Sequence, residues 1–183
     1  MEFRLFYRGL LPAGSSGKAD DKHRIRQAFR PQLAELWKQR RISEVKLDFF
    51  IEHHHKAMVT QRGDYRFLPL IGTFTKLACK LGILFLRPGE PGNIRTQSGD
   101  IDNRLKNLLD ALTVPPHNQV VGSPSDEEQP YFHCLLENDN LVTSINIETD
   151  RLLQPHSPDE VVLVIHVSAY ALELNGISVI LGN

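Results

Sequence analysis

An apolar stripe at helical spacing dominates the stretch SGDIDNRLKNLLDAL, residues 98–112. A helix with such a stripe has to bury that face against a sheet or another helix. Two aspartates one residue apart, Asp100 and Asp102, stand where this helix begins. The chain must therefore bury the leucine face while it keeps two carboxylates at the first turn. The stripe consists of Ile101, Leu105, Leu108, Leu109 and Leu112.

The segments around this helix alternate between patterns typical of strands and of helices. This order predicts an α+β fold in which a mixed β-sheet packs against two main α-helices. Pro31 lies inside the first helical pattern, so that helix is expected either to kink or to restart there. An Asn-Gly pair at 175–176 predicts a tight hairpin into residues 177–181. The expected strands cover residues 2–7, 44–55, 81–88, 140–153 and 161–174, and the first helix begins at Asp21.

A chain of 183 residues is long enough for one domain with its own core. We therefore expect a single domain over 1–183, with less determined insertions around 56–80 and 113–136. Cys79 and Cys134 form no disulfide framework and have no metal-ligand spacing, which favours a reducing compartment. No apolar segment is long enough to cross a bilayer, and the amino terminus has no apolar core typical of a signal peptide. A cytoplasmic protein without a membrane partner is the expectation.

The charges are divided unevenly along the chain, although the net charge is only −1. Residues 1–80 carry 16 Lys and Arg and 8 Asp and Glu, whereas the remaining residues carry 5 and 14. One interpretation is a polyanion-binding face beside a carboxylate-rich site. The other is that the two halves fold against each other and the charges mix on the surface.

The two aspartates have a structural and a chemical interpretation. Asp100 is a natural N-cap and Asp102 lies in the first turn, where the helix dipole favours negative charge. A cap needs only one carboxylate, however, and two carboxylates about 4 Å apart repel by about 4 kcal/mol unless a cation lies between them. Magnesium takes oxygen ligands of this kind. Lys106 follows Asp102 by one turn and is either a partner in an ordinary ion pair or a second functional group, whereas Asp110 is expected to be structural.

Three other sequence features are weaker indications of a functional site. The GSSGK stretch lacks the first glycine and the final Ser or Thr of a phosphate loop, so it is set aside. His53 and His55 share a face of an expected strand, but no third metal ligand with suitable spacing is evident. Three arginines of the first helix either meet phosphates or line a solvated face. They are Arg24, Arg26 and Arg30.

GDIDNRLKNLLDAL resembles the signature D-x-D-N-x-x-K-x-x-x-D-A-L of RusA-type Holliday junction resolvases, and residues 100–112 match every named position. The resemblance implies a RusA-like fold and a homodimeric endonuclease that uses Mg²⁺, or Mn²⁺ as a substitute, to nick four-way DNA junctions. In that family a third aspartate follows before the next strand, and ENDNLV offers Asp139 for that place. The resemblance therefore implies that Asp100, Asp102 and Asp139 hold the metal and that Lys106 assists at the scissile phosphate.

The chain departs from the family pattern in three respects. The segment between the helix and Asp139 is longer than in the family. Asn138 replaces the second acid before Asp139, which makes Glu137 an alternative ligand. Only Arg95 supplies positive charge directly before the aspartate pair.

Two further functions stay open on the sequence alone. A RusA-like nucleic-acid-binding module without catalytic activity predicts that Asp139 does not approach Asp100 and Asp102. A metal-dependent hydrolase acting on nucleotides predicts a closed pocket in place of an open basic groove.

Overall fold

The larger sheet has four strands and is mixed, as expected from the sequence. We analysed a computed structural model that describes residues 1–14, 18–39, 58–89 and 101–174. Strand β7 pairs antiparallel with β1 and β4, and β4 pairs parallel with β6. In spatial order the strands are β1 (Glu2–Leu10), β7 (Glu160–Ala171), β4 (Leu77–Arg87) and β6 (Val142–Arg151).

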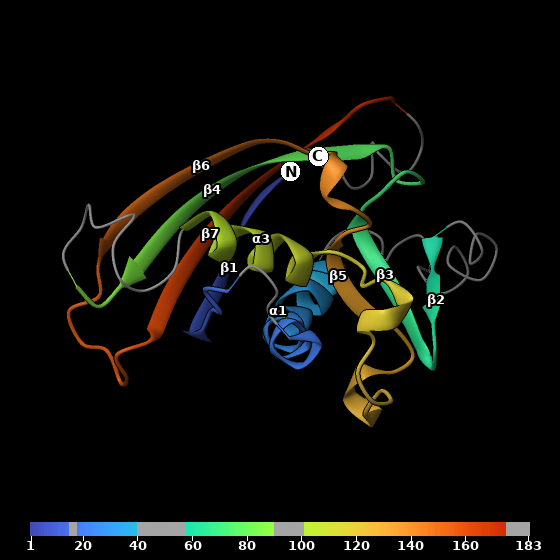
Figure 1. The fold of residues 1–183 in the computed structure, drawn as a ribbon. Coiled ribbons are helices and arrows are strands. Elements are labelled where there is room, and N and C mark those ends of the chain that lie inside the picture. Colours follow the sequence, from blue (N-terminus) through green and yellow to red (C-terminus); the bar gives the residue numbers. More distant parts are fainter. Residues whose placement is uncertain (15–17, 40–57, 90–100, 175–183) are drawn as a thin grey trace.

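Two helices cover one face of this sheet, as Figure 1 shows for α1 (Ala19–Gln39) and α3 (Ile101–Leu112). Their apolar stripes meet the inward-facing residues of the strands, because alternate residues of a strand point to the same face. The α+β fold class is thus confirmed. The core that forms includes Leu5, Ile25, Phe29, Leu33, Leu81, Ile83, Leu108, Leu112, Leu163 and Ile165.

A smaller sheet lies beside the carboxyl end of α3. Its strands are β2 (Thr60–Arg62), β3 (Tyr65–Ile71) and β5 (Phe132–Leu136), with β3 between the other two and parallel to β5. Tyr65, Phe67 and Phe132 contact one another at centroid distances of 5.3–5.7 Å. These three aromatic side chains form a cluster of their own, and Tyr65 and Phe132 of this cluster pack against His23 of α1.

The structure differs from the sequence predictions at several elements. The segment 56–80, for which no element was predicted, contains β2 and β3. Strand β4 begins at Leu77, four residues before the predicted start of that strand. Strand β5 was not predicted. Helix α1 continues through Pro31, so it does not restart there, which was one of the two expected outcomes. Residues 115–130 form connections with two 3-10 turns, His117–Gln119 and Asp126–Glu128. The expected strand over 44–55, with His53 and His55, and the hairpin into 177–181 lie outside the described residues. None of the described helices is long and apolar enough to span a bilayer.

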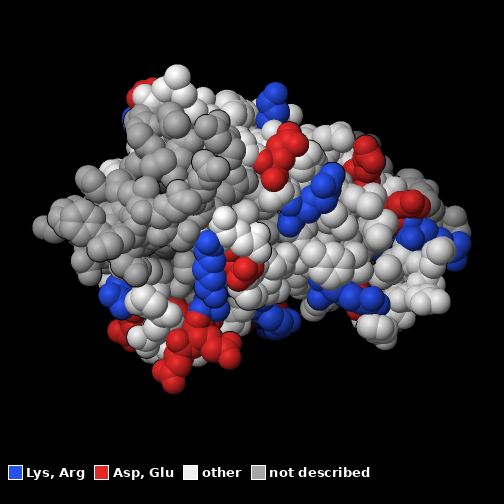
Figure 2. Space-filling model, turned by 180° about the vertical axis from the view of Figure 1, so that it is seen from behind, with Lys and Arg blue, Asp and Glu red and all other residues white. Residues whose placement is uncertain are grey.

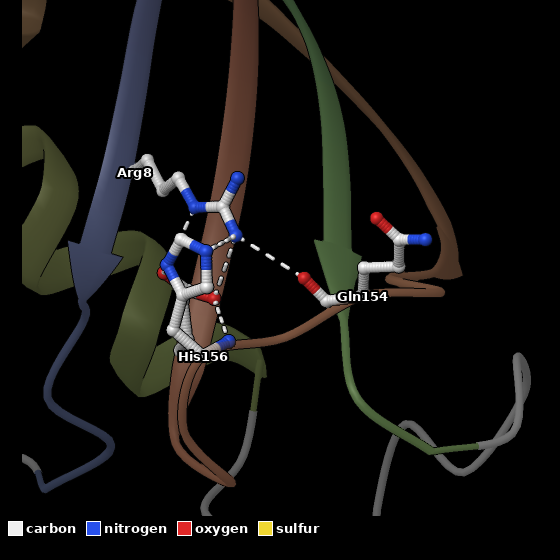
Figure 3. A network of polar contacts seen from close by, with 4 residues as sticks. Arg8, Gln154 and His156 are labelled. Atoms are coloured by element: carbon white, nitrogen blue, oxygen red, sulfur yellow. Dashed lines mark hydrogen bonds and ion pairs between the residues drawn. The ribbon is translucent and has the colours of Figure 1, made fainter.

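A polar network fixes the connection between β6 and β7 to the end of β1 (Figure 3). The Arg8 guanidinium donates to both carboxylate oxygens of Glu160, at 2.9 and 3.2 Å, and to the carbonyl oxygen of Gln154 at 3.1 Å. The backbone N–H of His156 donates to Glu160 at 2.7 Å. The bond from Arg8, followed by that of His156, lowers the pKa of Glu160 to about 2. The turn between β6 and β7 is therefore held by a carboxylate that stays ionised over most of the pH range.

Because His133 on β5 is buried, we predict that the protein loses stability as the pH falls from 6.5 to 4. Burial, with the positive charges of Arg30 and Lys38, lowers the pKa of His133 to about 4. The unfolded chain therefore binds a proton that the folded chain excludes, so stability is full above pH 6.5 and falls as the pH drops toward 4. At 1.36 kcal/mol per pKa unit the loss is at most about 3 kcal/mol. Urea unfolding at pH 7 and pH 4.5 measures it, and in His133→Gln the difference between the two pH values should be smaller by about this amount. An equal pH dependence in both proteins would contradict the assignment.

Candidate functional site

Helix α3 is anchored to the loop after β1, and this contact positions its first two turns. The Arg104 guanidinium donates to the carbonyl oxygen of Leu11, and Asn107 Nδ2 donates to the carbonyl oxygens of Pro12 and Gly14, each at 2.9 Å. Both side chains are buried. The polar residues of α3 thus form two groups. Arg104 and Asn107 bind the loop after β1, whereas other polar side chains point away from it.

Asp102 and Lys106 belong to the outward group. Both side chains are exposed, and they lie one turn apart on the same side of α3, about 6 Å along the axis. A carboxylate and an ammonium at this spacing suit a phosphodiester, because the carboxylate is a ligand for a hard cation and the ammonium neutralises phosphate charge. Asp100, the other member of the expected pair, lies outside the described residues.

Arginines gather at the same end of the large sheet. Arg87 and Arg151 end β4 and β6 and are direct neighbours in the parallel ladder. The Arg104 guanidinium is close enough to interact electrostatically with Arg87 and Asp159. Burial, followed by the charge of Arg87, lowers the pKa of Arg104 from its ordinary value. Arg87 and Asp159 therefore both lie near Arg104, at the end of the sheet where α3 begins.

Asp139 lies at the other end of the sheet. It begins the 3-10 turn Asp139–Leu141, which leads into β6 where Val142 pairs with Cys79 near the start of β4. Residues 79 to 87 of β4 span roughly 26 Å at about 3.3 Å per residue, and Arg104 interacts with the far end of that span. Figure 1 shows the same separation, with the turn before β6 close to the amino terminus and the first turn of α3 toward the ends of β4 and β6.

Within one copy of the chain, the structure brings Asp102 and Lys106 together and does not bring Asp139 to them. Glu137, the alternative ligand, accepts a hydrogen bond from the backbone N–H of Thr73 and is likewise remote from Asp102. In the described ranges, no three His, Cys, Asp or Glu residues form a group suited to a metal ion. A cation site made of Asp102 and Asp139 therefore does not fit a single copy.

Two residues of the first helix have roles that the sequence prediction missed. Lys22 Nζ contacts Asp110 at 2.6 Å, and only 7% of the Lys22 side chain is exposed, which supports the structural role expected for Asp110. Arg26 is 2% exposed and donates to the carbonyl oxygens of Asp110 at 2.7 Å and Thr113 at 3.2 Å. It lies neither on a solvated face nor toward phosphate. Its spacing to Phe29, three residues, was the signal for this inward position.

No family model matches this chain, and a search of curated proteins found no match either. The resemblance to RusA-type resolvases therefore rests on the motif in residues 100–112.

Proposed function

We propose that this chain is a RusA-like, metal-dependent endodeoxyribonuclease that resolves four-way DNA junctions by paired phosphodiester hydrolysis in recombination and repair. The observation that supports this function best is the exposed pair of Asp102 and Lys106 on the first turns of α3, inside the motif GDIDNRLKNLLDAL. Both groups are open to a large substrate, and Arg87 and Arg151 lie at the same end of the sheet.

Each of these residues has a separate part in the proposed chemistry. Arg87 and Arg151 attract the phosphate backbone, and this attraction weakens as salt rises. Lys106 neutralises the phosphate that is cleaved, and Asp102 supplies negative charge where a divalent cation or the attacking water is held. Mg²⁺, with Mn²⁺ as a substitute, would supply Lewis acidity to such a site.

A homodimer follows from the substrate rather than from the contacts within one copy. A four-way junction has approximate two-fold symmetry, and its resolution needs two nicks. A protomer of 20.8 kDa with one carboxylate site needs a symmetric partner to make both.

The remote position of Asp139 favours a second candidate, a RusA-like module that binds nucleic acid without cleaving it. A nucleotide hydrolase has less support, since it requires a closed pocket at the carboxylates. A cavity of about 280 Å³ is lined by residues including Asp64, Arg66 and Glu128, and none of its lining residues belongs to α3.

Binding in the presence of Ca²⁺ tests the shape selectivity that both nucleic-acid candidates share. A labelled four-way junction and a linear duplex with the same arm sequences are titrated with the protein at two salt concentrations. We expect at least about tenfold tighter binding to the junction, with affinity for both DNAs falling at higher salt. Equal affinity for the two DNAs, or hydrolysis of nucleotides without DNA binding, would contradict the proposed function.

A further inference from the structure

The cavity of about 280 Å³ lies beside the small sheet, and no residue of α3 lines it. Its walls come from the turn between β2 and β3, from β3 itself, and from the connection between α3 and β5. Pockets that hold small molecules have volumes of roughly 300–1,000 Å³ and are mostly apolar. This cavity is at the small end of that range and is lined by three charged side chains, Asp64, Arg66 and Glu128.

Glu128 is the buried member of this charged group, with only 7% of the residue exposed. Its carboxylate accepts hydrogen bonds from the Gln27 carboxamide at 3.0 Å and from the backbone N–H of Ser125 at 2.8 Å. Burial raises the pKa of Glu128, but these hydrogen bonds and the charge of His23 outweigh burial, so the pKa lies below its ordinary value. The carboxylate is therefore ionised at neutral pH.

No ion pair with another described residue compensates this charge. Both hydrogen-bond donors to Glu128 are neutral groups. Burial, followed by the charge of Arg26, lowers the pKa of His23, so its imidazole is uncharged at pH 7. Buried carboxylates in proteins are paired with a cation or hold a metal ion. An unpaired buried carboxylate on the wall of a cavity therefore favours a cationic group inside that cavity.

Asp64 and Arg66 add one charge of each sign to the same cavity. Asp64 accepts a hydrogen bond from the Ser123 hydroxyl at 2.9 Å. The Arg66 guanidinium lies over the Tyr131 ring, 5.5 Å from its centroid, and has no carboxylate of the described chain within ion-pair distance. Figure 2 shows acidic and basic side chains side by side at the lower left, where these segments reach the surface. Opposite charges thus line one cavity without pairing with each other.

We propose that this cavity binds a basic α-amino acid, of the class of lysine and arginine. The cavity presents two carboxylates and one guanidinium, and a basic amino acid carries the opposite set, two cationic groups and one carboxylate. Arg66 binds the carboxylate of the ligand, because a guanidinium presents its N–H donors in a planar fork that matches a carboxylate. Asp64 and Glu128 bind the two cationic groups. All charges in the cavity are then paired.

Other classes of ligand leave part of this charge unpaired. A phosphate group would pair with Arg66 but would face two carboxylates. A metal ion would suit the carboxylates but would face the guanidinium, and no three described His, Cys, Asp or Glu residues form a group suited to a metal ion. Because none of the lining residues belongs to α3, amino-acid binding does not depend on the proposed nuclease activity.

Calorimetric titration of the full-length protein at pH 7 with L-lysine and L-arginine tests the ligand class. Cadaverine and agmatine are the decarboxylated counterparts of the two amino acids, and norleucine lacks the side-chain ammonium. We expect at least one of the two amino acids to bind, at least about tenfold more tightly than its decarboxylated counterpart and than norleucine, because each analogue leaves a charged side chain unpaired. Absence of binding by both amino acids, or equal affinity for a bound amino acid and either analogue, would overturn the inference.

Two substitutions locate the binding in this cavity. Arg66→Gln should remove the preference for the amino acid over its decarboxylated counterpart, a change that loss of folding would not produce. Asp64→Asn should weaken the binding of both ligands by at least about tenfold. Arg24→Gln and Asp126→Asn are the matched controls, since both side chains are exposed and neither lines the cavity. Unchanged affinity in either cavity variant, or an equal loss in the controls, would refute this site.

Discussion

Replacing Asp102 by asparagine is expected to lower the rate of junction cleavage by at least about 100-fold, the order lost when one electrostatic contact to a transition state is removed. Asparagine keeps the size and the exposed position of the side chain in the first turn of α3. What it removes is the negative charge, and with it the means to hold a cation or to orient the attacking water. Junction binding should be retained, because the attraction for phosphate comes from neighbouring cations. Single-turnover cleavage and gel-shift titration measure the two properties separately.

Asp126→Asn supplies the control for this prediction. Asp126 is also an exposed aspartate, but it lies in the 3-10 turn Asp126–Glu128, which is separate from α3. Its replacement should change the cleavage rate by less than about threefold, as expected for a surface change away from a site. If Asp102→Asn instead loses junction binding and thermal stability together with cleavage, Asp102 is a structural residue of the helix start.

Replacing Arg26 by alanine is expected to destabilise the protein by about 3 kcal/mol. Arg26 joins α1 to the last turn of α3 by donating to the carbonyl oxygens of Asp110 and Thr113. Alanine would leave those carbonyls without a charged donor and would open a cavity in a position that is 2% exposed. Part of the loss is offset, since the buried guanidinium itself is costly to desolvate. Burial accordingly lowers the pKa of Arg26 from its ordinary value. The free energy of unfolding in urea measures the effect.

Arg24→Ala is the matched comparison on the same helix. Arg24 forms an ion pair with Asp21 at 3.1 Å, and 60% of its side chain is exposed. Such a surface pair contributes at most about 1 kcal/mol, so its removal should change stability little. If Arg24→Ala and Arg26→Ala were equally stable, the anchoring role of Arg26 would be refuted.

The periodic elements of the fold were predictable from the sequence, and the short ones were not. The leucine stripe of α3 specifies its helical conformation and its buried face, and the alternating residues of β6 and β7 specify their strand conformation. Strands β2 and β5 have three and five residues, which is too short for a period to be visible. Strand β5 is specified by its parallel pairing with β3, a contact that becomes visible only when the chain is folded. Pro31 stays within α1, because packing outweighs the loss of one hydrogen bond.

The candidate site was predictable only where it is local in the sequence. Asp102 and Lys106 share one helix, so their spacing alone predicts that they lie on the same side. Asp139 depends on the direction of β6 relative to β4, and no local pattern reports that two strands are parallel. Because β4 and β6 run in the same direction, a residue that follows β4, such as Asp102, lies at one end of the sheet. A residue that precedes β6, such as Asp139, lies at the other end. The inward direction of Arg26, by contrast, was visible in its helical spacing.

The most direct test of the proposed activity is cleavage of a synthetic four-way junction by the wild-type protein in Mg²⁺. Each strand of the junction is labelled in turn, and the nicks are mapped to single nucleotides, with a linear duplex alongside. We predict two nicks at symmetric positions in opposite strands of the junction, none in the duplex, and none when the cation is chelated. A junction that is bound tightly but stays intact in both Mg²⁺ and Mn²⁺ would contradict the account and would identify the chain as a binding module.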